Sequence, residues 1–136
     1  DKYNIAKLVD GVRISHQEYY SNMFNSKIIM APIGYGEMAP RDVESAMFGS
    51  VLVKPDMSYI SSEPFIYDDD ETYISVNYDW SNLEEKIDYV LSDYDNIRER
   101  LVQNMRKRYH EKYDLKNLVI HFYNILKNVN GISIDE

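Results

Sequence analysis

The chain has 136 residues, 44% of them hydrophobic and 28% charged, which indicates one globular domain with room for one core. The formal net charge is −8, and this argues against broad nucleic-acid binding, which needs a basic surface. There is no cysteine, which excludes disulfides, zinc–thiolate sites and thiol nucleophiles. No apolar run reaches membrane-spanning length and no signal peptide is visible, so we expect a cytoplasmic protein without a transmembrane segment.

The N-terminal part predicts a helix, a strand and a second helix. Residues 1–11 have apolar residues at helical spacing, and residues 12–15 have the composition of a short strand. The sequence "SHQE" then forms a capping box, in which a serine hydroxyl and a glutamate each satisfy a free backbone N–H. The second helix is therefore predicted from His16 to about Asn25.

A strand–helix–strand unit follows. "KIIMAP", residues 27–32, predicts a buried strand because its apolar residues do not alternate with polar ones. "APRDVESAMFG" predicts a helix with Pro40 in the first turn and Gly49 just past the end. "SVLV", residues 50–53, is the next buried strand. Because the links are short, the unit is predicted to be a parallel crossover.

The C-terminal half predicts two more strands and three helices. The strands are at residues 65–67 and 72–78, where β-forming residues are concentrated. A second capping box, "SNLE" at 81–84, starts the first helix. We expect these helices to complete the core.

The last two helices are predicted from caps and apolar spacing. Asp93 or Asp95 caps the first of them, and Asp114 caps the second. The final helix has an apolar stripe that consists of Leu115, Leu118, Val119, Phe122, Leu126 and Val129.

Charge is unevenly distributed along the chain. Residues 63–95 contain eleven acidic residues and one basic residue, whereas residues 98–116 contain seven basic and three acidic ones. The two segments are either solvated faces, or the basic one docks a partner or an acidic lipid surface. Within the acidic segment, "DDDE" at 68–71 is either a solvated turn or a site for a hard cation.

The loop "GYGE", residues 34–37, joins a buried strand to a helix N-terminus. The first-turn N–H groups of a helix lack partners, the helix dipole favours negative charge there, and glycine lets a phosphate approach the backbone. In open α/β sheets, ligands usually bind at the carboxyl ends of the strands. The loop is therefore either an anion site or a tight turn without a ligand.

Two carboxylates lie at the two ends of this unit. Glu44, four residues after Pro40, can accept two hydrogen bonds from the hydroxyls of a ribose, while Glu37 is nearer any group beyond the phosphates. The alternatives are that Glu37 only complements the helix dipole, and that Glu44 is solvated or paired with Arg41.

Residues 26–58 resemble the donor-binding region of GT-B glycosyltransferases, which are built from two Rossmann-like domains, and especially of exostosin-like members. The residues that match this pattern are Ser26, Lys27, Pro32, Gly34, Gly36, Glu37, Arg41, Asp42, Glu44, Gly49, Lys54, Pro55, Asp56 and Met57.

The resemblance implies an α/β fold, with a Rossmann-like parallel sheet flanked by helices. Residues 1–136 would form one donor-binding domain of a longer glycosyltransferase, which transfers a sugar from a nucleoside diphosphate to an unknown acceptor. The preceding acceptor-binding domain would be missing, and neither a cofactor nor a metal is implied. The alternative is a non-catalytic nucleotide-binding or protein-interaction module on the same fold.

The resemblance also implies roles for individual residues. Backbone N–H groups after Gly34 and Gly36 would hold the pyrophosphate, Arg41 would neutralise its charge, and Glu44 would bind the ribose. Glu37 would face the transferred sugar and is the candidate catalytic residue. The substrate-binding residues implied are Gly34, Tyr35, Gly36, Glu37, Arg41, Glu44 and Lys54.

A surface that faces a missing domain should expose apolar groups. We expect such groups around Met38, Met57 and Tyr59, and we expect Tyr67 and Tyr73 to line the same side because they also follow the strand that ends at Lys54.

Overall fold

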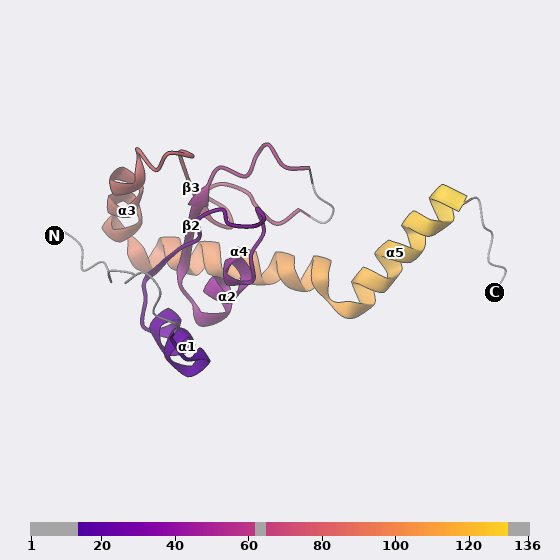
Figure 1. Cartoon of the computed structure of the whole chain (residues 1–136), viewed down its shortest axis with the longest axis horizontal. Coiled ribbons are helices and arrows are strands. Elements are labelled where there is room, and N and C mark those ends of the chain that lie inside the picture. The colour runs from indigo at the N-terminus through magenta and orange to yellow at the C-terminus, as the bar shows by residue number, and fades with distance from the viewer. Residues whose placement is uncertain (1–13, 62–64, 131–136) are drawn as a thin grey trace.

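The computed structural model describes residues 14–61 and 65–130, together with all side chains in these ranges except those of residues 112 and 128–130. The helix predicted at residues 1–11 lies outside these ranges. Three parallel strands form one sheet in the order β1-β2-β3, and helices flank it (Figure 1). The strands are β1 (Ile28–Met30), β2 (Val51–Pro55) and β3 (Ile74–Val76). The helices are α1 (His16–Phe24), α2 (Pro40–Phe48), α3 (Leu83–Ser92), α4 (Tyr94–Tyr113) and α5 (Leu115–Asn130).

The predicted β1–α2–β2 crossover is confirmed. Pro40 is the first residue of α2, and Gly49 ends the helix with φ +80°, in the left-handed region that favours glycine. Every residue of β2 is buried, because this central strand is covered on both faces. β1 is an edge strand, and it is only partly buried rather than fully buried as predicted.

The sheet separates two apolar clusters. On one face Leu52 packs with Ala46 of α2 and Met105 of α4. On the other face Val51 and Val53 pack with side chains of α3 and of the first half of α4. The alternation along β2 assigns its side chains to the two faces in turn. The fold is therefore α/β with helices on both faces of a small parallel sheet.

Two strand predictions are not confirmed in the described residues, and residues 12 and 13 of the first strand lie outside these residues. Ile14 and Ser15 are not in a strand, because Ser15 caps α1 and its hydroxyl accepts the Glu18 N–H at 3.1 Å. Residues 65–67 are also irregular. There a side chain provides a hydrogen bond that a neighbouring strand would otherwise provide, since the Thr72 hydroxyl donates to the Ile66 carbonyl at 2.7 Å.

The cap predicted for α3 is misplaced by one residue. The helix begins at Leu83 with Asn82 as its cap residue, and Ser81 precedes it. The Asn82 side-chain oxygen accepts the Asn77 N–H at 2.7 Å. This oxygen therefore stabilises the turn before the helix and does not cap a backbone N–H of α3. The cap predicted for α5 is confirmed, because Asp114 accepts the Lys116 N–H at 3.0 Å.

Most of the basic segment lies in α4, and its arginines bind other parts of the same chain. Arg98 Nε donates to the Gly49 carbonyl at 2.6 Å, and Arg106 donates to the carbonyls of Ala46 and Met47. These carbonyls lie at the C-terminal end of α2, where a cation is favoured by the helix dipole. These three hydrogen bonds fix α2 against α4, a use of the basic segment that differs from both predictions.

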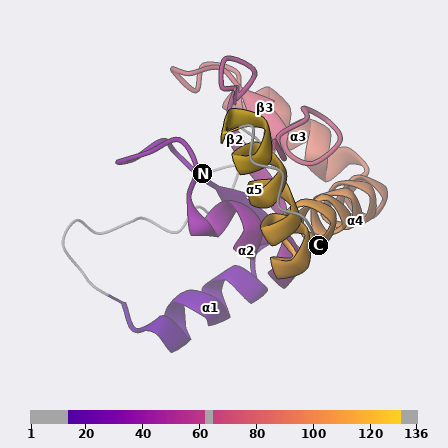
Figure 2. The same cartoon turned by 90° about the vertical axis from the view of Figure 1, so that its right-hand side faces the viewer.

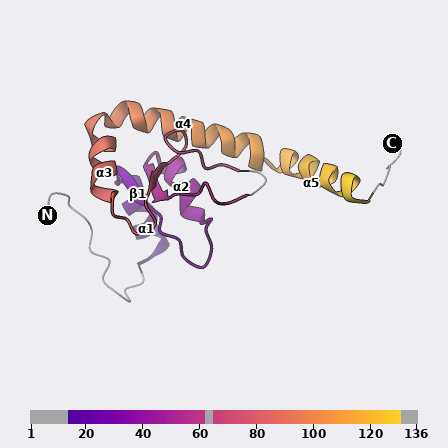
Figure 3. The ribbon, with the colours of Figure 1, turned by 90° about the horizontal axis from the view of Figure 1, so that it is seen from above.

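α5 does not complete the core as expected. Figures 1 and 3 show α4 running along the body of the molecule and α5 continuing beyond it. Its main contacts are with α4, to which it is joined. The core is therefore closed by the sheet, α2, α3 and α4.

Candidate nucleotide site at the carboxyl edge of the sheet

The loop between β1 and α2 leaves the sheet at its carboxyl edge. The Ala31 N–H still donates to Val53 of β2, at 2.9 Å, and the chain then turns away. A Cβ atom added at Gly34 or Gly36 would meet nothing within 4 Å, and neither glycine has a left-handed φ. Packing and backbone conformation therefore do not require glycine here, and the backbone of both residues faces open space.

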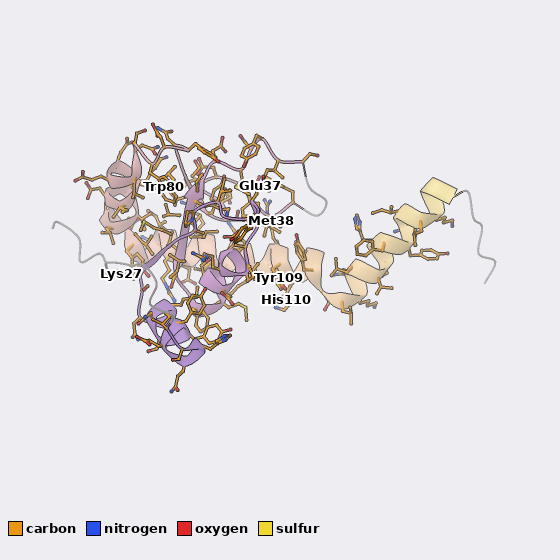
Figure 4. The ribbon with its side chains drawn as sticks, viewed as in Figure 1. Lys27, Glu37, Met38, Trp80, Tyr109 and His110 are labelled. Carbon is orange, nitrogen blue, oxygen red and sulfur yellow. The ribbon has the colours of Figure 1, made fainter. Side chains whose placement is uncertain are left out.

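The loop presents a carboxylate beside apolar side chains. Tyr35, Glu37 and Met38 are all exposed, and Figure 4 places Glu37 and Met38 next to each other above α2. The pKa of Tyr59 is raised above its ordinary value by desolvation and then by the nearby negative charges of Glu37 and others. Tyr59 is 60% exposed, so this edge of the sheet presents an aromatic ring to solvent within the range of the Glu37 charge.

The surface expected to face another domain is only partly present. Met38 and Tyr59 are exposed as predicted, but Met57, Tyr67 and Tyr73 are buried. The Tyr73 hydroxyl accepts the Met57 N–H at 3.0 Å, and the rings of Tyr67 and Tyr73 pack edge to face. These three residues belong to the core below the edge.

Glu44 is held by a tyrosine from another helix. The Tyr19 hydroxyl donates to Glu44 Oε2 at 2.9 Å, and Figure 2 shows α1, which carries Tyr19, lying beside α2. Burial and the bond to Glu44 raise the pKa of Tyr19 to about 12, and the positive charge of Arg41 opposes this rise to a smaller extent, so Arg41 also acts on this pair. An ionised carboxylate has about four acceptor positions, so the bond from Tyr19 orients Glu44 without exhausting it.

Lys54 is the predicted site residue with the least access to a ligand. Its side chain is 0% exposed, and Nζ lies 3.2 Å from Asp42 Oδ2. Asp42 Oδ2 also accepts the Tyr67 hydroxyl at 2.6 Å and the Ala39 N–H at 3.0 Å. A role of Lys54 in substrate binding stays a prediction, and in this geometry Lys54 would act on a ligand through its charge.

The buried pair positions the N-terminus of α2. Asp42 lies in the first turn of α2, Lys54 lies near the end of β2, and Tyr67 comes from the segment after the next loop. Because the three side chains meet at one carboxylate, they hold the start of the helix at a fixed place over the carboxyl end of the sheet. The pairing with Lys54 also offsets the negative charge of Asp42 near the proposed anion site.

The acidic run at residues 68–71 is tied to α4. Asp68 pairs with Arg108, Asp70 Oδ1 lies 3.0 Å from Arg100 Nη2, and Glu71 accepts a hydrogen bond from Asn104 at 2.9 Å. Across residues 14–61 and 65–130, no group of three His, Asp or Glu side chains could hold a metal ion. The run forms a turn, as in the first of the two predictions, but three of its carboxylates bind side chains of α4 and are not simply solvated.

Two tyrosines with raised pKa values, the buried Tyr73 and the partly buried Tyr19, predict a loss of stability in alkali. Burial raises the pKa of Tyr73 to about 12, and burial with the bond to Glu44 raises the pKa of Tyr19 to about 12. The unfolded value is about 10, so the folded state favours the neutral phenols. This contribution to stability is complete below about pH 10 and is lost as the pH rises toward 12. Urea unfolding and phenolate absorbance from pH 8 to 12 measure it; unchanged stability across this range would contradict the prediction.

None of the helices in the described part of the chain is long and apolar enough to span a membrane. Comparison of the chain with models of known families, with curated proteins and with solved structures finds no match. The candidate site therefore rests on its own geometry and on the sequence resemblance.

The structure brings most of the predicted site residues into one unit. Gly34, Tyr35, Gly36 and Glu37 share the exposed loop, and Arg41 follows in the first turn of α2. Glu44 lies one turn later and faces α1. The sequence analysis did not predict that Tyr19 is the partner of Glu44 or that Asp42 is the partner of Lys54. The sequence "DVE" at residues 42–44 carries no signal for which element each of its two acids would face.

Proposed function

We propose that this chain is the donor-binding domain of a GT-B type glycosyltransferase. The observation that carries the proposal is the exposed Gly34–Glu37 loop at the carboxyl edge of a parallel sheet, leading into the N-terminus of α2. In such a position backbone N–H groups and the helix dipole favour a diphosphate. The expected location in the cytoplasm, the sugar nucleotide and a second, acceptor-binding domain belong to this proposal.

The proposed chemistry is sugar transfer from a nucleoside diphosphate. Negative charge develops on the leaving diphosphate as the bond to the sugar breaks, and groups that stabilise this charge accelerate the reaction. Here the N–H groups of the loop and the exposed guanidinium of Arg41 serve this purpose. Glu44 accepts hydrogen bonds from the ribose, and Glu37 faces the sugar.

Replacing Glu44 by alanine is expected to weaken nucleoside diphosphate binding by about 1–3 kcal/mol, the range for a hydrogen bond that involves a charged group. Calorimetry with a panel of nucleoside diphosphates measures this loss. Glu99→Ala is the matched control, because it removes the same charge from the exposed surface of α4.

The panel also separates the proposed function from its alternative. If no nucleoside diphosphate binds to the parent chain, the donor-binding proposal is wrong. If the parent binds and Glu44→Ala binds equally well, the ribose role of Glu44 is wrong while the anion site stands. Binding by a full-length protein that transfers no sugar would favour the non-catalytic module.

A further inference from the structure

α5 exposes an apolar stripe with coiled-coil spacing. Leu115, Val119, Phe122 and Leu126 follow one another at intervals of four, three and four residues, which places them on one face of the helix. These side chains are between 59% and 76% exposed. Such exposure is high for large apolar side chains at regular spacing along one helix face. The stripe is therefore expected to be a surface that packs against another molecule or segment.

The helix has little to support it within the chain. α5 has 16 residues and extends away from the body (Figure 3). Helices of this length are marginal in water by themselves, and most of their stability comes from packing an apolar face. A partner for the stripe would supply this missing stability.

We propose that a second copy of this chain covers the stripe, so that two α5 helices pair antiparallel. In this arrangement Leu115 lies opposite Leu126 of the second copy, and Val119 lies opposite its Phe122. Each layer at the centre then combines a small side chain with a large one, which packs better than two phenylalanines in one layer. Leu118 and Ile125, seven residues apart, widen the seam along one side.

The charge distribution favours this occupant. The whole chain has a net charge of −8, so two copies repel each other over most of their surfaces. From Leu115 to Asn130 there is no acidic residue, which makes α5 a place where two copies can meet. Lys116 then lies opposite Tyr123 of the second copy, so no like charges face each other across the seam. The antiparallel orientation also places the two acidic bodies at opposite ends.

The polar side of α5 argues against a lipid surface as the occupant. Helices that lie on membranes have a strongly charged polar face that is rich in Lys or Arg. Here the residues outside the apolar face are mostly uncharged, and Lys116 and Lys127 are the only charged residues in the helix. Because the seam is only about two heptads long, the dimer should be weak, with a dissociation constant of roughly 1–100 µM.

Sedimentation velocity over a concentration series tests the proposal. The parent chain should pass from monomer to dimer in the micromolar range. Phe122→Glu puts a charge into the seam and should remain monomeric throughout the series. Asn124→Glu adds the same charge to the opposite side of the same helix and should dimerise like the parent. Since α5 lies outside the core, both variants should unfold in urea like the parent chain.

The orientation can be tested because the chain has no cysteine of its own. The double variant Lys116→Cys/Tyr123→Cys should give dimers with a short bismaleimide, and each single variant should give far less. A parent chain that is monomeric throughout the series would overturn the proposal. Equal dimerisation of Phe122→Glu and Asn124→Glu would also overturn it, as would binding to anionic vesicles by a chain that stays monomeric.

Discussion

Replacing Asp42 by alanine is expected to lower the free energy of unfolding by about 3–5 kcal/mol. The change leaves the ammonium group of Lys54, which is 0% exposed, without its counter-ion. It also removes the acceptor for the Tyr67 hydroxyl and the Ala39 N–H. A typical domain has only about 5–15 kcal/mol of stability, so the change would remove a large part of the stability of this chain. Urea unfolding monitored by circular dichroism measures the change.

A matched variant separates the charge effect from a general loss of packing. The triple change Asp42→Leu/Lys54→Met/Tyr67→Phe replaces the buried polar groups by apolar groups of similar size. Apolar replacements of buried ion pairs are often neutral, so this variant should regain most of the lost stability. If the single and triple variants are equally unstable, the unpaired charge of Lys54 is not the cause.

The second large effect is expected at Gly49, where alanine should cost about 2 kcal/mol. Gly49 has φ +80°, a conformation that strains any residue with a Cβ atom by about 1–2 kcal/mol. The new Cβ would also lie 2.6 Å from Arg98 Nη2. Arg98 cannot move away freely, because its Nε donates to the Gly49 carbonyl at 2.6 Å. The measurement is again the free energy of unfolding.

Gly34→Ala is the control for this prediction. At Gly34 the backbone is outside the left-handed region and the added Cβ meets no atom within 4 Å. Its effect on stability should therefore stay within about 0.5 kcal/mol. Equal destabilisation by the two substitutions would show that the backbone conformation of Gly49 does not matter.

Local signals in the sequence were sufficient for the central part of the fold. Pro40 and Gly49 bounded α2 correctly, and the apolar runs before and after it predicted two parallel strands. Each of these signals depends on residues within a few positions of one another. The strand predicted at 65–67 failed because a side chain, that of Thr72, satisfies the backbone there. The prediction that α5 completes the core was wrong, because an amphipathic pattern shows that a helix face needs a partner but does not show which partner.

In the candidate site, too, features set by neighbouring residues were predicted and contacts between distant segments were not. The loop and the start of α2 were predicted together because they are consecutive in the sequence. The partners of the two acids in α2 were not, since Tyr19 and Lys54 come from α1 and β2. The packing of whole helices and strands decides such contacts, and no spacing in one sequence records it. The roles of Glu37, Arg41 and Glu44 toward a ligand stay predictions.

The arginines on α4 have a consequence for the order of events during protein synthesis. Arg98 lies 49 residues after the carbonyl that it binds, and Arg106 lies 60 and 59 residues after its two carbonyls. When α2 leaves the ribosome, the arginines that bind its last carbonyls have not yet been synthesised, and the face of the sheet below it is still open. Closing so long a loop costs chain entropy before any contact is gained. The β1–α2–β2 unit therefore reaches its final stability only after α4 has been synthesised, and a nascent chain released before Arg98 would expose its apolar sheet.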